Sequence, residues 1–235
     1  MKKGFLYLIP SAIGLDGTQA ISEEVKNIVQ QLTLFIVENE KSARRYLRSI
    51  GYKKEFLEST LILMDKNFPE NLSSKAFDFL KEGIDVGLIS EAGMPCIADP
   101  GNFWVKEAHR LDIKVKPLTG PSSILLSLIG SGLNGQQFCF NGYLPVNSSE
   151  RIIKIKKMES LSASRKETQI FIETPYRNNA LLDELLKTCS SKTLLCIASE
   201  LTLPSEFIKT NFISDWKKNK PDLHHKPTVF LIYSK

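Results

Sequence analysis

The stretch that most constrains this chain runs from residue 85 to residue 101 and reads DVGLISEAGMPCIADPG. Its apolar start, residues 86–89, is short and is bounded by glycines, which is typical of a buried strand that enters a loop. Two glycines give the loop backbone freedom and two prolines stiffen it, and we expect Asn102 to cap a following helix. Composition alone favours an ordinary turn, but open α/β sheets bind ligands at such strand ends.

Composition excludes several classes of protein. The chain has 235 residues, 42% hydrophobic and 24% charged, which suits one large globular domain or two small ones. The apolar run at residues 5–9 is too short for a signal peptide, and no run approaches the roughly 18 residues of a membrane span. The cysteines have no paired spacing, which indicates neither zinc nor disulfides. We therefore expect a cytoplasmic protein without a metal and without a membrane partner.

The charge of the chain is mildly basic, with a net charge of +5 and a pI of about 8.9. This balance is compatible with a polyanionic partner but does not require one. Basic residues cluster in three segments, 41–54, 151–157 and 217–220. A solvated helix face explains each cluster about as well as contact with RNA does.

Strand-like and helix-like patterns alternate along the whole chain. Strands are expected at 5–9, 34–37, 61–64, 86–89, 113–116, 138–140, 169–173, 194–198 and 228–233. Helices are expected after caps at Ser22, Ser74, Asn102 and Ser122 or Ser123, and at 42–50, 149–161, 178–188 and 211–219. The apolar strands favour an α/β fold with mainly parallel or mixed sheets covered on both faces. We place two α/β domains at 1–117 and 118–235, near a glycine-rich segment at 130–135 that reads as a linker.

Three further loops at strand ends accompany the first. They are LIPSAIG at 8–14, TGPSS at 119–123 and ETPYR at 173–177. In this order, and together with residues 88–101, they resemble the tetrapyrrole methylase family, the class III S-adenosylmethionine-dependent methyltransferases. Within it, the chain is most similar to the branch that methylates a cytidine ribose 2′-hydroxyl of ribosomal small-subunit RNA. The resemblance covers residues 6–233.

The resemblance implies two α/β domains, a homodimer, and S-adenosylmethionine folded in a cleft between the domains. By matching positions it implies these cofactor-binding residues: Pro10, Ser11, Gly93, Met94, Pro95, Ile97, Ser122, Ser123, Tyr176, Leu201 and Pro227. Packing would also explain Met94, Ile97 and Leu201, and a helix cap would explain Ser122. The position of all these loops at strand ends favours the cofactor site.

Methyl transfer from a sulfonium is an in-line displacement, so a protein has mainly to align donor and acceptor. A hydroxyl acceptor would be helped by a general base, for which Glu91, Glu200 and Tyr176 are the candidates on the motif loops. Arg177 could hold a phosphate through its planar fork. The alternative for Glu200 is a surface or helix-capping carboxylate, and for Arg177 an ion pair.

The chain also departs from the ribosomal branch. Residues 38–41 read ENEK where that branch has an acidic-Asp-Thr-Arg motif. Residues 90–92 read SEA where an aspartate is usual, and Pro175-Tyr176 replaces Pro-His. We also expect no carboxyl-terminal extension of the kind that longer members carry. Cofactor binding is therefore better supported than RNA as the acceptor. Two alternatives stay open: methylation of a tetrapyrrole or other small molecule, and a non-catalytic RNA-binding protein of the same fold.

Overall fold

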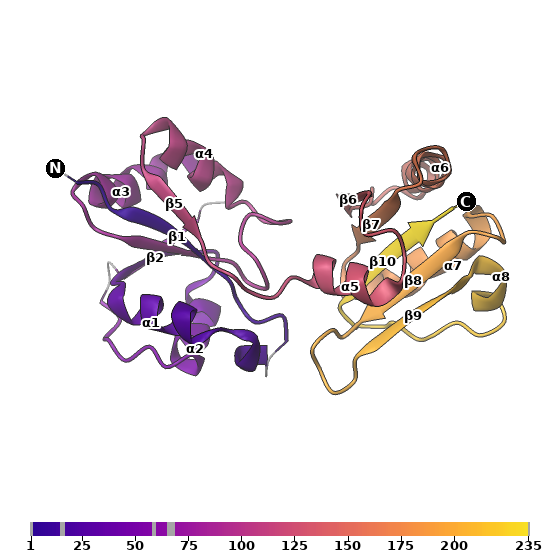
Figure 1. Cartoon of the computed structure of the whole chain (residues 1–235), viewed down its shortest axis with the longest axis horizontal. Coiled ribbons are helices and arrows are strands. Elements are labelled where there is room, and N and C mark those ends of the chain that lie inside the picture. Colours follow the sequence, from indigo (N-terminus) through magenta and orange to yellow (C-terminus); the bar gives the residue numbers. More distant parts are fainter. Residues whose placement is uncertain (1, 15–16, 58–59, 65–68, 235) are drawn as a thin grey trace. The chain divides into compact units, whose positions relative to one another are not determined.

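The computed structural model describes residues 2–14, 17–57, 60–64 and 69–234, with the backbone alone for 69–74. The chain divides into two compact units (Figure 1). Unit 1 is residues 1–122 and unit 2 is residues 123–235. The division lies a few residues beyond the boundary expected from the sequence.

Unit 1 is built on a parallel sheet with the strand order β3-β2-β4-β1-β5. The strands are β1 (Phe5–Ile9), β2 (Leu34–Val37), β3 (Leu61–Leu63), β4 (Val86–Ile89) and β5 (Lys114–Pro117). Four of them are apolar runs, as sheets covered on both faces require. The first strand, β1, lies inside the sheet between β4 and β5, which come much later in the chain.

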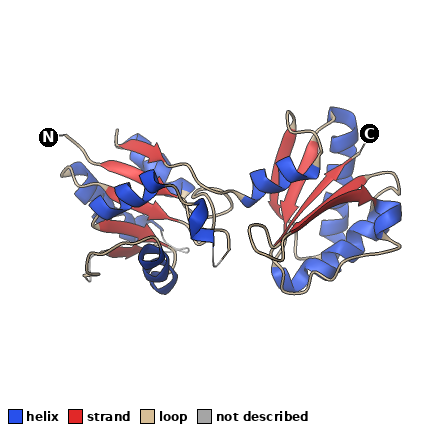
Figure 2. Cartoon of the chain, turned by 60° about the horizontal axis from the view of Figure 1, so that its bottom comes forward, coloured by secondary structure: helices blue, strands red, loops and turns tan. Residues whose placement is uncertain are grey.

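Helices cover both faces of this sheet. On one face lie α1 (Glu23–Gln31) and α2 (Glu40–Ser49), and on the other α3 (Pro69–Lys81) and α4 (Asn102–Arg110) (Figures 1 and 2). Neighbouring β1 residues enter different cores, Leu8 the core that contains Trp104 and Ile9 the core that contains Val25. The chain thus leaves β1 toward one face and the neighbouring β4 toward the other. Such a reversal opens the crevice in which α/β proteins bind ligands.

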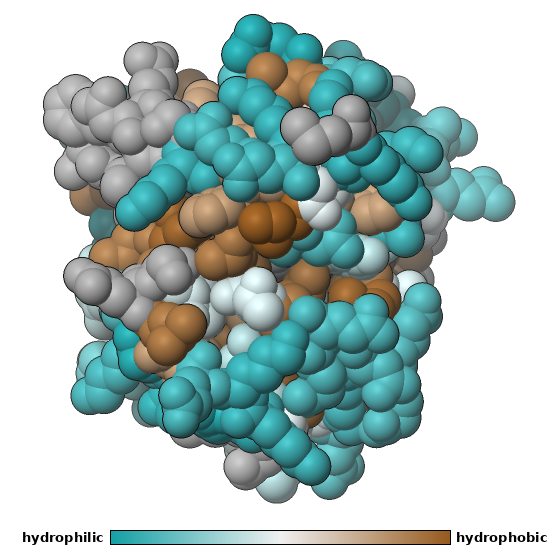
Figure 3. Space-filling view, turned by 90° about the vertical axis from the view of Figure 1, so that its left-hand side faces the viewer, coloured by the Kyte–Doolittle hydropathy of each residue, from teal (hydrophilic) through white to brown (hydrophobic). Residues whose placement is uncertain are grey.

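The amino-terminal strand ends of unit 1 differ in character from the carboxyl ends. Figure 3 looks onto that side, and apolar side chains form a band between polar ones. Leu57 and Ile84, which precede β3 and β4, are 64% and 36% exposed. All the motif loops of unit 1 follow the opposite ends of the strands.

Unit 2 contains a mixed sheet with the strand order β6-β7-β10-β8-β9, in which only β6 and β7 are parallel. The strands are β6 (Phe138–Tyr143), β7 (Thr168–Ile172), β8 (Leu194–Ser199), β9 (Phe207–Phe212) and β10 (Thr228–Tyr233). One face packs on α5 (Ser123–Ser131), and the other on α6 (Ser148–Arg165), α7 (Asn178–Thr188) and α8 (Ile213–Trp216). The two sheets confirm the expected α/β fold with parallel and mixed sheets. Within the described residues, no helix has the length and apolar character to cross a bilayer.

Several predicted helix boundaries were wrong. α2 starts at Glu40 because Asn39 caps it, with its side-chain oxygen accepting from the amides of Lys41 and Ser42. α3 starts at Pro69, so Ser74 lies inside the helix. The cap of α4 is Gly101, and Asn102 is its first helical residue.

Two predictions in the second half were also wrong. The segment read as a linker, 130–135, begins inside α5, which extends to Ser131. The segment 211–219 is helical only at 213–216, and the strand β9 before it was not predicted. β9 is an edge strand paired with β8 alone, so polar Lys209 and Asn211 interrupt its apolar pattern.

Candidate functional site

Two motif loops of unit 1 are joined by their backbones. The Ser11 amide donates to the Gly93 carbonyl at 2.8 Å, and the Gly93 amide donates to the Ser11 carbonyl at 3.1 Å. The Ser11 hydroxyl also donates to the Ser90 carbonyl at 2.6 Å. Gly93 has a φ of +71°, which side chains disfavour, so this close approach uses glycine's freedom. The loops after β1 and β4 thereby form one rigid edge.

The third motif loop reaches the same edge through Gly120. A Cβ atom on Gly120 would lie 2.1 Å from Cβ of Pro10 and 3.6 Å from the sulfur of Met94. Only a glycine therefore lets this loop lie against both of the others. The structure brings Pro10, Ser11, Gly93 and Met94 together with the loop that leads to Ser122.

Asp99 stabilises the carboxyl-terminal half of the loop after β4. Its carboxylate accepts from the amide of Cys96 at 2.9 Å and from the amide of Gly101 at 2.7 Å. Cys96 and Ala98 are both in the left-handed region, with φ of 68° and 63°. Burial raises the pKa of Asp99, and burial together with Asp99 raises the pKa of the Cys96 thiol to about 11. Sequence reasoning missed this role, although Asp-Pro-Gly is a turn signal.

The remaining predicted residues of unit 1 differ in exposure. Pro95 is buried, whereas the Ile97 side chain is 44% exposed. Ser122 is buried directly before α5, whose first residue is Ser123. Ile97 is thus an apolar side chain that the loop presents to the outside.

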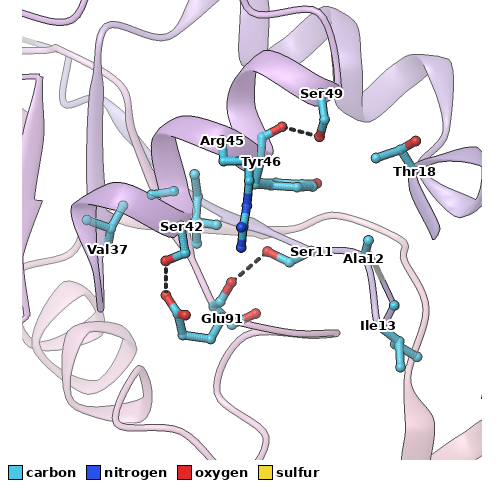
Figure 4. A pocket seen from close by; sticks show the side chains of 14 residues that line it. Ser11, Ala12, Ile13, Thr18, Val37, Ser42, Arg45, Tyr46, Ser49 and Glu91 are labelled. Atoms are coloured by element: carbon cyan, nitrogen blue, oxygen red, sulfur yellow. Dashed lines mark hydrogen bonds between the residues drawn. The ribbon is translucent and has the colours of Figure 1, made fainter. Parts of the chain in front are cut away.

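A hollow of about 240 Å³ opens beside the joined loops (Figure 4). We call it the unit 1 hollow; it is lined by residues 11–14, Thr18, Val37, residues 89–91 and five residues of α2. Those five are Ser42, Ala43, Arg45, Tyr46 and Ser49. Sequence reasoning treated α2 only as a basic helix. Its place after β2, at the same sheet edge, was the available signal.

Hydrogen bonds fix the polar groups of the unit 1 hollow. The Ser42 hydroxyl donates to the Glu91 carboxylate at 2.6 Å (Figure 4). The Tyr46 hydroxyl donates to the Pro10 carbonyl at 2.5 Å and so ties α2 to the first loop. Burial raises the pKa of Tyr46 above its ordinary value, so the side chain stays a neutral phenol. Of the three catalytic candidates, Glu91 is the one that lines this hollow.

In unit 2, Arg177 is engaged by its own loop. It closes a short 3-10 turn, Pro175–Arg177, and its Nη2 donates to Oε1 of Glu173 at 2.6 Å. Its Nε donates to the Thr174 hydroxyl at 3.0 Å, and the guanidinium lies 5.5 Å from the ring centre of Tyr176. The Glu173 side chain is only 1% exposed, whereas Tyr176 is 62% exposed. Arg177 therefore makes the ion pair that was its alternative interpretation.

Glu200, Leu201 and Pro227 gather at one end of the unit 2 sheet. The Glu200 amide donates to the Pro227 carbonyl at 2.9 Å, and the Glu200 carboxylate lies 3.6 Å from Nζ of Lys226. Leu201 is buried beside them. The Asn178 side-chain amide donates to the Lys226 carbonyl at 2.6 Å, which ties the Tyr176 turn to this group. Sequence reasoning had not assigned Asn178.

The sequence is similar to curated methyltransferases. A Buchnera aphidicola (subsp. Schizaphis graminum) "Ribosomal RNA small subunit methyltransferase I" is 32% identical over 98% of this chain and 78% of its own length. The protein of the same name from Pasteurella multocida is 29% identical over 99% of this chain and 80% of its own length. No family model matches the sequence.

The fold is similar to those of solved tetrapyrrole methyltransferases. The methyltransferase CobJ matches with a TM-score of 0.64 and 19% identity, covering 98% of this chain and 94% of its own. Cobalt precorrin-4 methyltransferase CbiF matches with a TM-score of 0.62 and 14% identity, covering 97% and 94%. At these identities the likeness concerns the fold alone.

Proposed function

The chain belongs to the ribosomal RNA small subunit methyltransferase I family, which is a family of methyltransferases, and from this we propose its full reaction. It transfers the methyl group of S-adenosylmethionine to a ribose 2′-hydroxyl of ribosomal RNA, as a homodimer in the cytoplasm. The observation that carries the proposal is the bridge between Ser11 and Gly93. It assembles two motif loops from distant parts of the sequence at the switch point of a parallel sheet.

The joined loops suit a sulfonium cofactor electrostatically. Residues 10–14, 90–101 and 118–123 contain no lysine, arginine or histidine, and they carry the acidic side chains of Glu91 and Asp99. A positively charged ligand therefore meets no like charge on these loops. Half-buried Met94 and exposed Ile97 offer apolar contact. Gly93, Met94, Pro95 and Ile97 would hold the methionine and sulfonium part of the cofactor.

S-adenosylmethionine supplies a methyl group already activated on sulfur, so the chain has to orient the acceptor and remove its proton. We assign the role of general base, which accepts the proton of the acceptor hydroxyl, to Glu91, whose carboxylate lines the unit 1 hollow. Ser42 donates to Oε1 of Glu91 and holds the side chain in place. Tyr176, Leu201 and Pro227 stay predictions for the adenine, and Glu200 and Arg177 stay predictions for catalysis.

Calorimetric titration with S-adenosylmethionine and S-adenosylhomocysteine tests the cofactor site. The variant is Gly93→Ala, and the control is Gly132→Ala in unit 2. Both glycines have a positive φ, +71° and +68°, so an alanine is similarly strained at either position. We expect wild type and Gly132→Ala to bind both ligands and Gly93→Ala to bind them weakly. No binding by folded wild type would refute the proposal.

The acceptor is tested by transfer of a labelled methyl group. Small ribosomal subunits from a strain lacking the gene serve as the substrate, and uroporphyrinogen III serves as the small-molecule control. We expect label in one cytidine ribose of the RNA and none in the tetrapyrrole. Label in the tetrapyrrole would favour the small-molecule alternative. Stoichiometric RNA binding without cofactor binding would favour the non-catalytic one.

A further inference from the structure

One arginine of α2 enters the unit 1 hollow, while its two neighbours are held elsewhere. Arg44 pairs with Glu40 at 3.2 Å, and its guanidinium lies 5.2 Å from the ring centre of Phe56. Arg48 donates to the Tyr52 carbonyl at 2.5 Å and lies 4.6 Å from the same ring. Arg45 lines the hollow instead, and Figure 4 shows its side chain directed toward Ser11 and Ser42.

Arg45 has no acidic partner among the residues that the structure describes. Glu91 lines the same hollow, but its carboxylate accepts from Ser42 and forms no ion pair with Arg45. Arg45 is exposed, and it is the one cation among the described lining residues. A planar guanidinium beside a hollow, without a carboxylate to neutralise it, is suited to bidentate binding of an anion.

The other groups of the hollow suggest which anion fits. The Thr18 hydroxyl lines it and can donate to an oxygen atom, whereas the Ser49 hydroxyl donates to the Tyr46 carbonyl at 2.7 Å. Its volume of about 240 Å³ lies below the range of about 300–1,000 Å³ for pockets of drug-sized ligands. That size suits one sugar and its phosphate better than a macrocycle. The candidate base Glu91 lies in the same hollow, where the sugar hydroxyl must be deprotonated.

We propose that Arg45 binds a backbone phosphate of the acceptor RNA next to the nucleotide that is methylated. This inference rests on the proposed function and adds the residue that places the acceptor sugar at Glu91. The ligand is a phosphodiester of the strand. Neighbouring Arg44 and Arg48 are tied to Glu40, Phe56 and Tyr52 and contribute less to this contact.

The test compares Arg45→Gln with Arg45→Lys and with the matched control Arg44→Gln. The equilibrium binding of an RNA oligonucleotide carrying the methylated sequence is measured over a range of salt concentrations, without cofactor. Arg45→Gln should weaken binding about tenfold, as loss of a charge-assisted hydrogen bond does. The slope of log K against log salt should fall by about 0.7, the value for one phosphate of a single strand. Arg45→Lys should keep the slope, and Arg44→Gln should resemble wild type.

Other results would overturn the inference. These are equal losses in Arg45→Gln and Arg44→Gln, an unchanged slope in Arg45→Gln, or no RNA binding by wild type. Competition by cytidine 3′-monophosphate at the oligonucleotide's own affinity would assign the site to a free nucleotide instead. Calorimetry with S-adenosylmethionine is run on the same samples. If wild type binds the cofactor and transfers methyl groups but Arg45→Gln binds RNA like wild type, only this inference is rejected. If wild type does not bind the cofactor, the proposed function itself is rejected.

Discussion

Gly120 offers the most direct test of how the motif loops are assembled. An alanine there would place its Cβ 2.1 Å from Cβ of Pro10 and 2.4 Å from Cγ of the same ring. Ordinary contact begins near 3.4 Å, so the two loops would have to separate by about 1.3 Å. The proline ring cannot swing aside, because it is part of the backbone of the first loop.

The expected size of the effect follows from this displacement. Overpacking of this kind destabilises a protein by about 1–3 kcal/mol. A shift of about 1 Å in a positioning contact can lower a catalytic rate about a hundredfold. We expect Gly120→Ala to stay folded with a lower melting temperature. It should also lose most of its affinity for S-adenosylhomocysteine, because Met94 lies against the third motif loop and moves when that loop is displaced.

The assay is calorimetric titration with S-adenosylhomocysteine, together with thermal unfolding. Gly135→Ala is the control, because a Cβ on Gly135 has no neighbour within 4 Å. If Gly120→Ala bound the ligand and melted like Gly135→Ala, the contact between the first and third loops would not matter for the site. The proposed arrangement of the cofactor loops would then be refuted.

Three further predictions concern single side chains. Glu91→Gln should lower kcat for methyl transfer at least about a hundredfold and leave cofactor affinity unchanged. Ser42→Ala should cause a smaller loss of kcat. An unchanged kcat in Glu91→Gln would exclude Glu91 as the base. Because the pKa of Cys96 is raised to about 11, roughly one thiol in a thousand is ionised at pH 8. Alkylation of Cys96 should therefore lag behind that of exposed Cys139 and rise about tenfold per pH unit, which mass spectrometry can follow; equal rates at pH 8 would contradict this. Arg177→Ala should lower the free energy of unfolding by about 3 kcal/mol, because it leaves a buried carboxylate unpaired, and denaturant titration would show no change if the pair were unimportant.

The sequence was sufficient for much of the fold. Apolar runs such as Phe5–Ile9 and Leu34–Val37 coincide with strands because a sheet covered on both faces needs apolar residues at successive positions. Helix starts were less well predicted, since the cap of α2 is an asparagine before a charged segment. The edge strand β9 was missed because a lysine and an asparagine interrupt its apolar pattern.

The candidate site was predictable only in its loops. The motifs gave Ser11 and Gly93 separately, but their mutual hydrogen bonds depend on the order of strands in the sheet. The sequence did not show which arginine of α2 lines the unit 1 hollow, because three arginines lie close together on that helix. Packing of Phe56 against Arg44 and Arg48 decides which one faces the loops, and that contact comes from a later segment.

The position of β1 between two strands that follow much later has a consequence for how the protein forms during synthesis. β1 is made first, but both of its neighbours, β4 and β5, are made only after residue 85. A nascent chain that ends after β3 therefore lacks β4, the strand that joins β2 to β1 in the sheet. Pairing between strands distant in the sequence is slow and late. The loop after β1 acquires its partner at Gly93 only when most of unit 1 has emerged. Truncated nascent chains should thus remain unable to hold a methyl donor until nearly all 122 residues of the unit are available.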